Sequence, residues 1–330
     1  MNEITTHTFD EQLSRNVGLD LVRVTETTAL AAGSWVGSGD FANAHRAATR
    51  AMADALNTLE MNGHIVIGEE DRLGEDSPLC SGQSVGTGHG PEVDILVDPI
   101  DGTNLLINGK PGAVSVVGIA PRGTVWSPVS ARYMEKIVVD QRAAAALVPQ
   151  CMDAPAAWTL ALIARHKKKS VRDLSVIVLE RSRNQDLIEE IRECGARVLL
   201  REEGDAEGAL IAATNDTDVD VLMGIGGVSQ GVLAACAVKA SGGAMLARLR
   251  PQDEAERESI RKAGLDENRI LSCSELVNSN QIFFAATSIT GGALMRAMQF
   301  WGNYASTHSL LIRSETGTRR IIHAEHGTHL

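Results

Sequence analysis

The pattern of hydrophobic and polar residues along the chain predicts alternating helices and strands. Apolar positions recur at helical spacing over 17–36 and 46–62, and the glycines of GSGD at 37–40 favour the end of the first helix because glycine accepts a positive φ. Runs rich in Val and Ile instead have the composition or the alternation of strands. In this half of the chain we expect strands at 64–71, 92–103, 112–120 and 133–139.

The second half repeats a strand-then-helix order that is typical of an α/β sheet. The strand-like LSVIVLE at 174–180 precedes the helix-like NQDLIEEIRECG at 184–195, in which Gly195 is the expected C-cap. The same order recurs, with strands expected at 196–200 and 218–227 and helices at 206–214 and after Gly227. The exposed N–H groups at the start of that last helix can receive a phosphate.

A change of composition separates the two halves. Residues 141–174 are first rich in Ala and then basic, as in ARHKKKSVRD at 164–173. We therefore expect an N-terminal α+β domain over 1–170 and a C-terminal α/β domain over 171–330.

Charge and cysteine content narrow the class of protein. The chain has 330 residues, 31 Lys+Arg and 42 Asp+Glu, a net charge of −11 that argues against a broad nucleic-acid or anionic-membrane surface. The five cysteines are scattered and include no CxxC pair, so neither a disulfide framework nor a zinc knuckle is expected. The start of the chain is polar, and no apolar run approaches the ~20 residues that span a bilayer. We expect a cytoplasmic protein without a membrane partner.

Two acids stand close together in ILVDPIDGTNLL at 95–106, directly after an apolar run. Asp98 and Asp101 would repel each other, and a divalent cation coordinated by both removes that repulsion. Glu69 ends another predicted strand, and open α/β sheets bind ligands at strand ends. A metal held there polarises a phosphoryl oxygen and acidifies a bound water, which Thr103 can orient, so phosphate-ester hydrolysis is indicated. The alternative is that each acid is a solvated strand end.

Several segments of the chain resemble those of a known enzyme family. DPIDGT at 98–103 resembles the signature of the metal-dependent, lithium-sensitive sugar and inositol phosphatases. Segments such as GHIVIGEED, VGTGHGPEVDILVDPIDGTNL, YMEKIVV and LLIRSETGTRRI resemble, in order, the bacterial GlpX-type class II fructose-1,6-bisphosphatases from about residue 17 to the C-terminus. The resemblance implies a layered α/β/α/β/α sandwich, a homo-oligomer (dimer or tetramer), and removal of the 1-phosphate of fructose 1,6-bisphosphate with Mg²⁺ or Mn²⁺ in gluconeogenesis.

The resemblance also implies roles for individual residues. The metal-binding carboxylates of the family fall on Glu69, Asp98 and Asp101, in the N-terminal domain, and the expected catalytic residues are Glu69, Asp98 and Thr103. The second domain supplies most substrate contacts, with RSR where the family usually has KPR and EGD where it has DGD. Arginine suits the non-reacting phosphate because a guanidinium binds it bidentately. The expected substrate contacts are Asp101, Gly102, Thr103, Tyr133, Arg181, Ser182, Arg183, Glu203, Gly204, Asp205 and Gly227.

Two further metal positions depart from the family. In GDFANAH at 39–45 the family's ligand Asp is replaced by His45, and in GGVSQGV at 226–232 its ligand Glu is replaced by Gln230. Imidazole suits Mn²⁺ or Zn²⁺ better than Mg²⁺, so Zn²⁺ joins the candidate metals. The loss of two anionic ligands weakens a divalent site. The acidic loop EEDRLGEDSP at 69–78 offers Glu70, Asp71, Glu75 or Asp76 as a replacement carboxylate, although for each of these acids alone a solvated loop position is the favoured interpretation.

These departures leave alternatives to fructose 1,6-bisphosphate hydrolysis. Altered RSR and EGD segments are compatible with a related substrate, such as sedoheptulose 1,7-bisphosphate or an inositol or sugar monophosphate. His45, Phe41 and Gln230 are compatible with a catalytically weak paralogue that binds a phosphorylated sugar or assembles with an active partner. A dehydrogenase is disfavoured because GIGGVSQG lacks the GxGxxG spacing.

Overall fold

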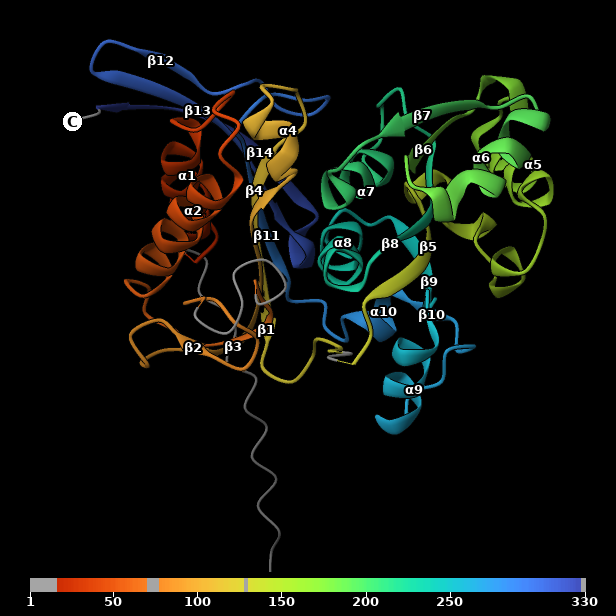
Figure 1. Ribbon diagram of the computed structural model, residues 1–330, viewed down its shortest axis with the longest axis horizontal. Helices are drawn as coiled ribbons and strands as arrows, with labels where there is room; N and C mark the ends of the chain where they lie inside the picture. The colour runs from red at the N-terminus through yellow and green to blue at the C-terminus, as the bar shows by residue number, and fades with distance from the viewer. Residues whose placement is uncertain (1–16, 70–76, 128–129, 328–330) are drawn as a thin grey trace, which may run out of the picture.

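Helices and sheets alternate in layers through the molecule. The computed structural model describes residues 17–69, 77–127 and 130–327. Helices α1 and α2 cover the outer face of one sheet, α7 and α8 lie between the two sheets, and α5 and α6 cover the outer face of the second sheet (Figure 1). The predicted α/β/α/β/α sandwich is therefore confirmed.

The first sheet has eight strands in the order β12-β13-β11-β4-β3-β1-β2, with β14 paired to β13. Strands β1 and β3 are parallel, whereas β3 and β4 are antiparallel, so the chain turns back directly after the acidic segment. The strand bounds are β1 Asn62–Ile67, β2 Ser84–Val85, β3 Glu92–Asp101, β4 Val114–Pro121, β11 Phe283–Ser288, β12 Gln299–Trp301, β13 Tyr304–Arg313 and β14 Thr318–Gly327.

The second sheet has six strands in the order β10-β9-β5-β8-β6-β7. Its strands are β5 Tyr133–Val139, β6 Ser175–Leu179, β7 Arg197–Arg201, β8 Val221–Gly227, β9 Ala244–Leu249 and β10 Leu271–Ser272. Sheet membership does not follow the expected division at residue 170, because β5 lies in the second sheet and β11 to β14 return to the first. The domain boundary itself stays a prediction.

Most predicted helices occur, with shifted ends. The second helix begins at Phe41 rather than residue 46 because the Asp40 carboxylate accepts a hydrogen bond from the Asn43 N–H as its N-cap. The helices are α1 Val17–Gly33, α2 Phe41–Leu56, α4 Thr103–Ile107, α5 Ala156–Lys167, α6 Gln185–Glu193, α7 Asp205–Ala213, α8 Val228–Ala240, α9 Glu254–Lys262 and α10 Cys273–Leu276. The 3₁₀ turns are η1 Gln141–Ala146, η2 Pro149–Met152, η3 Val171–Asp173, η4 Ser182–Asn184 and η5 Ser314–Thr316.

The central layer forms the largest part of the core. Helices α7 and α8 are buried between the two sheets and consist mainly of apolar residues, and α8 exposes little besides Ser229, Gln230 and Lys239. Burial raises the pKa of Cys236 and of Cys273 to about 12, so both thiols stay protonated and unreactive. In the described part of the chain, no helix has the length and apolarity needed to cross a membrane.

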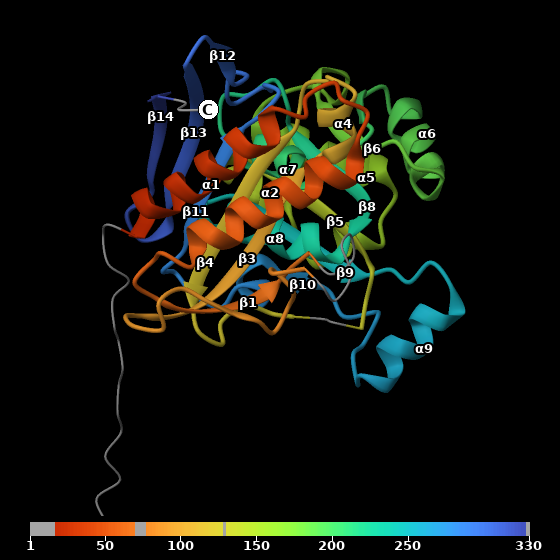
Figure 2. The same ribbon diagram turned by 60° about the vertical axis from the view of Figure 1, so that its left-hand side comes forward.

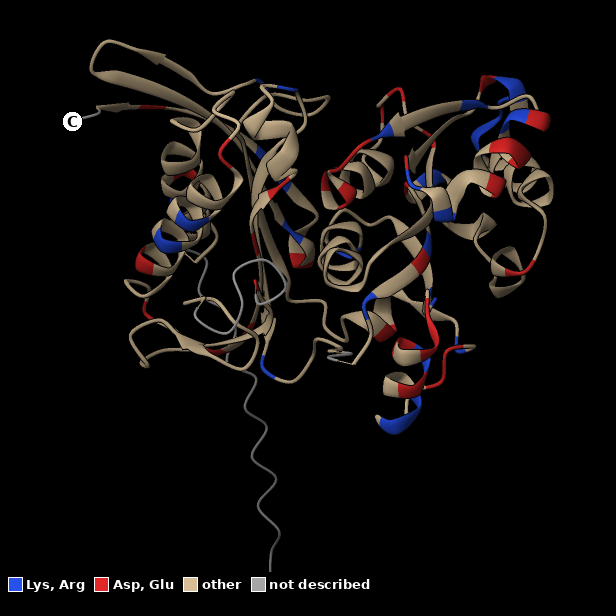
Figure 3. Ribbon diagram, viewed as in Figure 1, with Lys and Arg blue, Asp and Glu red and all other residues tan. Residues whose placement is uncertain are grey.

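Two lysines of the basic run at 164–173 form ion pairs within the fold. Lys167 lies 3.1 Å from carboxylate oxygens of both Asp140 and Asp220, and Lys169 lies 2.7 Å from Asp220. Acidic and basic residues are mixed over α6 and α9 rather than gathered by sign (Figure 3). The run therefore ties α5 to the sheet ends.

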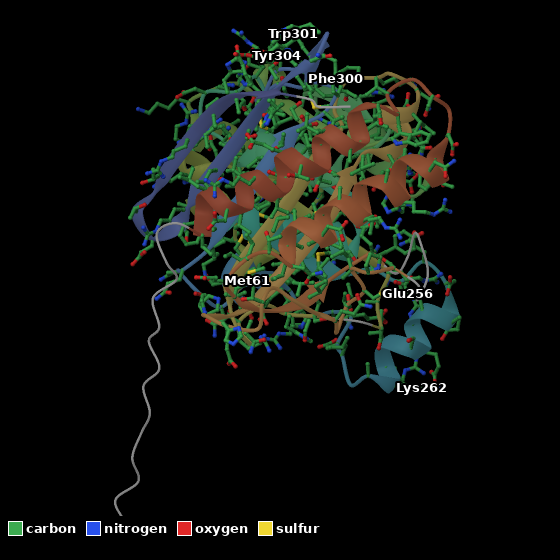
Figure 4. All side chains as sticks on the ribbon, turned by 90° about the vertical axis from the view of Figure 1, so that its left-hand side faces the viewer. Met61, Glu256, Lys262, Phe300, Trp301 and Tyr304 are labelled. Carbon is green, nitrogen blue, oxygen red and sulfur yellow. The ribbon has the colours of Figure 1, made fainter. Side chains whose placement is uncertain are left out.

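Exposed aromatic side chains gather at one end of the first sheet. Phe300, Trp301 and Tyr304 lie on the β12–β13 hairpin and are 50%, 44% and 55% exposed (Figure 4). The same view shows α9, with Lys262, projecting at the opposite end of the molecule.

Candidate active site

The carboxylates predicted from the sequence lie at neighbouring strand ends. The parallel pairing of β1 and β3 finishes at Ile67 opposite Leu96, and Glu69 and Asp98 each follow that pair by two residues. Asp98 lies within β3, whereas Glu69 lies just beyond the end of β1. Glu69 is 3% exposed and Asp98 1% exposed. Acids this deeply buried are expected to have polar or charged neighbours.

A bulge re-aims the next acid. Between Asp98 and Asp101 the register shifts against β4, with Asp98 opposite Val116 and Asp101 opposite Val114. Pro99 has no N–H to give to the ladder, which is a physical reason for a bulge there. Asp101 is buried at the end of β3, and Gly102 then adopts a left-handed conformation with φ 94° and starts α4.

The helix starting at Gly102 places the predicted water-orienting hydroxyl. Thr103 is the first residue of α4 and is 1% exposed. Its hydroxyl donates a hydrogen bond to the Ile100 carbonyl at 3.1 Å. Asp98, Asp101 and Thr103 therefore come from one continuous segment around a single turn.

The two substituted metal positions contact the acids directly. His45, on α2, is fully buried, and its Nε2 lies 2.6 Å from Glu69 Oε2. The imidazole stacks on Phe41, with ring centroids 5.9 Å apart. Gln230, near the start of α8, donates from Nε2 to Asp98 Oδ2 at 3.5 Å. The structure thus brings each of the two replacement side chains to a carboxylate.

The fit of a metal to these residues is partial. Buried carboxylate oxygens are the donors that a hard divalent cation prefers. Within the described ranges, however, no three or more His, Cys, Asp or Glu side chains are arranged to hold a metal ion. The acids expected to compensate, Glu70, Asp71, Glu75 and Asp76, lie outside the described residues. The described side chains therefore have suitable donor chemistry but do not complete a metal centre.

Three expected substrate residues meet at the ends of two central strands of the second sheet. Tyr133 begins β5 and pairs with Gly227 at the end of β8. The Arg183 guanidinium lies over the Tyr133 ring, 4.7 Å from its centroid, and its Nε donates to the Ile225 carbonyl at 3.1 Å. Partial burial lowers the pKa of Arg183 from 12.5, although such a group remains charged near neutral pH.

The segment around Arg183 is fastened by a residue that sequence reasoning missed. The Asn184 side chain donates to the Leu179 and Ile225 carbonyls at 3.0 and 3.2 Å and accepts from the Ile225 N–H at 2.8 Å. Arg181 and Ser182 precede it, and Arg181 donates to the neighbouring Glu180 carbonyl. Its position directly after the RSR segment was the one sequence feature that pointed to Asn184.

Tyr133 is fastened by a second missed residue. Glu256, on α9, is 3% exposed, and its Oε1 accepts from the backbone N–H groups of Arg132 at 2.6 Å and Tyr133 at 2.9 Å. Nothing in the local sequence connects α9 with Tyr133, because the two are more than 120 residues apart.

The EGD segment bonds mainly to the protein itself. Asp205 Oδ2 lies 2.5 Å from the Nζ of Lys136, a buried lysine that sequence reasoning did not single out. A Cβ on Gly226 would lie 2.0 Å from the same Asp205 oxygen, so the pair requires glycine there. Glu203 and Gly204 lie at the start of α7, facing α4.

Comparison with known proteins agrees with this arrangement. The family model described as bacterial fructose-1,6-bisphosphatase, glpX-encoded, matches residues 15–326. The "Fructose-1,6-bisphosphatase class 2" of Haemophilus influenzae is 37% identical over 327 residues, covering 95% of this chain and 97% of that protein. Two Synechococcus proteins named "D-fructose 1,6-bisphosphatase class 2/sedoheptulose 1,7-bisphosphatase" are each 35% identical over 340 residues, covering 95% of this chain and 96% of theirs.

These matches extend over nearly the whole chain and contain both halves of the site described above. The family consists of metal-dependent phosphatases, which are phosphoric monoester hydrolases. This chain therefore belongs to the family of glpX-encoded bacterial fructose-1,6-bisphosphatases.

Proposed function

We propose that this chain hydrolyses the 1-phosphate of fructose 1,6-bisphosphate, as a step of gluconeogenesis. The observation that carries the proposal is the pairing of two groups of residues in a chain of this family. Buried Glu69, Asp98 and Asp101 end strands of the first sheet, while Arg183 stacks on Tyr133 at the second sheet. One group has the chemistry for the reacting phosphate and the other for an anion held at a distance.

In the proposed mechanism, the second sheet binds the phosphate that does not react. Arg183, with Arg181 and Ser182, provides N–H and O–H donors for that phosphate, and a guanidinium can donate two parallel hydrogen bonds to it. The Tyr133 ring and the Ile225 carbonyl limit the orientations open to Arg183. The sugar is thereby oriented with its other phosphate towards Asp98 and Thr103.

At the reacting phosphate, the Thr103 hydroxyl orients the attacking water. Its hydrogen bond to Ile100 holds the side chain in one rotamer. A divalent cation would be held by Glu69, Asp98 and Asp101, and it would supply Lewis-acid polarisation of the phosphoryl oxygen and acidification of water. We propose Mg²⁺ or Mn²⁺, with Zn²⁺ as the alternative that an imidazole favours. Glu69 holds the His45 ring in place, and Gln230 holds Asp98.

The experiment measures phosphate release from fructose 1,6-bisphosphate with Mg²⁺, Mn²⁺ and Zn²⁺ in parallel. The wild type is compared with Asp98→Asn and with the double variant His45→Asp, Gln230→Glu. Asp94→Asn is the matched control, since Asp94 is buried on the same strand and its Oδ2 accepts from the Thr124 and Val125 N–H groups.

Metal-stimulated activity that Asp98→Asn abolishes and Asp94→Asn retains supports the proposal. Absence of release in the wild type with every metal contradicts it. Activity that emerges only in the double variant means that His45 and Gln230 have removed the metal chemistry from this chain.

Sedoheptulose 1,7-bisphosphate is the second candidate substrate. Two relatives carry that activity in their names. Relative kcat/KM values for the two bisphosphates and for an inositol monophosphate decide between them. The cytoplasmic location and the homo-oligomeric state, dimer or tetramer, stay predictions.

A further inference from the structure

Two helices from different layers begin next to each other at the proposed active site. Helix α4 follows β3 of the first sheet, and α7 follows β7 of the second (Figures 1 and 2). Each helix has a glycine at its N-cap in the left-handed conformation, Gly102 with φ 94° and Gly204 with φ 84°. A glycine has no side chain, so neither cap residue can satisfy the N–H groups of its own helix.

Each helix is capped instead by the acid that precedes the other helix's glycine. Asp101 Oδ2 accepts a hydrogen bond from the Glu207 N–H of α7 at 3.0 Å. Glu203 Oε2 accepts from the Asn104 N–H of α4 at 2.9 Å, and Glu203 Oε1 accepts from Asn104 Nδ2 at 2.5 Å. The two carboxylates thus form a reciprocal cap across the layers.

The reciprocal cap depends on close backbone approach. A Cβ built on either Gly102 or Gly204 would lie 3.4 Å from the same Gly112 carbonyl oxygen. A Cβ on Gly204 would also lie 2.8 Å from the Arg201 guanidinium. Glycine at both caps therefore permits the approach that a larger residue would oppose.

We propose that Glu203 is a positioning residue that holds α4, and with it Asp101 and Thr103, in register with the second sheet. The inference rests on the proposed function, in which Asp101 and Thr103 act on the reacting phosphate. In this role Glu203 acts through Asn104. Both of its carboxylate oxygens accept hydrogen bonds from Asn104.

This role predicts a particular kinetic signature. Loss of the cap on α4 lets Thr103 and Asp101 move relative to the bound phosphate, and a displacement of 1 Å can cost about 100-fold in rate. We expect Glu203→Ala to lower kcat by about 10-fold or more while KM changes less than about 3-fold. Glu203→Gln keeps a carbonyl oxygen for the Asn104 N–H and is expected to recover most of kcat.

The neighbouring Glu202 offers a matched control. It pairs with Lys110 at 2.6 Å, and both side chains are about half exposed. Glu202→Ala removes the same charge one residue away without touching α4, so kcat is expected to stay within about 2-fold of the wild type.

The experiment combines kinetics with amide hydrogen exchange of the full-length protein. Peptides that cover 103–107 report on the α4 N–H groups whether or not the chain is an active phosphatase. Faster exchange in Glu203→Ala, near-normal exchange in Glu203→Gln and Glu202→Ala, and the kcat loss together support the positioning role.

Unchanged exchange in Glu203→Ala overturns the proposal, and a rise in KM alone would then assign Glu203 to sugar contact. Faster exchange with unchanged kcat also overturns it, because the cap would be structural only. A wild type that releases no phosphate contradicts the proposed function separately, since exchange still reports on the cap.

Discussion

The buried pair Lys136–Asp205 allows a quantitative test of the structure. The Nζ and Oδ2 atoms are 2.5 Å apart, and the side chains are 1% and 7% exposed. At an effective dielectric constant of about 20, Coulomb's law puts their attraction at roughly 6–7 kcal/mol. Part of this attraction only offsets the cost of removing both charges from water. Lys136→Met keeps the apolar length of the side chain but leaves Asp205 buried without its cation. We expect a loss of about 3–5 kcal/mol in the free energy of unfolding.

Urea unfolding of a double-mutant cycle isolates the interaction. The cycle compares the wild type, Lys136→Met, Asp205→Asn and the double variant at neutral pH. The second substitution removes a charge that the first has left without a partner. The loss in the free energy of unfolding of the double variant is therefore expected to be smaller than the sum of the two single losses, by at least about 2 kcal/mol. The control cycle uses Lys110→Met and Glu202→Gln. That pair has nearly the same separation, 2.6 Å, but is about half exposed. Its coupling is expected to be at most about 1 kcal/mol.

Additive single losses would refute the reasoning, because they would mean that the two charges do not stabilise each other in the folded state. Equal coupling in the buried and exposed cycles would refute it as well, since the argument attributes the difference to burial alone.

Three further predictions follow from other contacts. Gly226→Ala places a methyl group on the Asp205 carboxylate and is expected to cost about 1–3 kcal/mol by urea unfolding, whereas an unchanged midpoint would contradict the close approach. Burial alone would raise the pKa of Asp220, but hydrogen bonds, chiefly from Lys169, hold it below 3.8. Its stabilising contribution is therefore complete above about pH 4 and lost as the pH falls through the lowered pKa, so urea midpoints of Asp220→Asn and wild type should differ at pH 7 and converge in acid. Arg183→Lys loses the bidentate fork and the stacking, and KM for the bisphosphate is expected to rise about 10-fold or more with a smaller change in kcat; an unchanged KM would remove Arg183 from the phosphate site.

Local sequence patterns were sufficient for much of the fold and for part of the site. The β3 segment has a continuous apolar run that ends in Asp98, Pro99 and Asp101. The two acids are buried at the proposed active site, and Pro99 lies at the bulge between them. Gly195, with φ 83°, directly follows Cys194 at the end of α6, close to the helix end that the sequence predicted. These features were predictable because backbone conformation and strand burial depend mainly on neighbouring residues. The start of α2 was misplaced because the Asp40 cap was not recognised.

The partners of the polar groups were decided only by the tertiary structure. Lys136 meets Asp205 across 69 positions, Glu203 meets Asn104 across 99, and Glu256 reaches Tyr133 across 123. The return of β11 to β14 to the first sheet is equally non-local. The sequence alone determined which residues carry charge, which backbone positions turn and which segments are apolar enough to be buried. Which charges neutralise each other depends on how the layers stack, because a buried ionic or hydrogen-bonded pair forms only where packing excludes water from both partners at once.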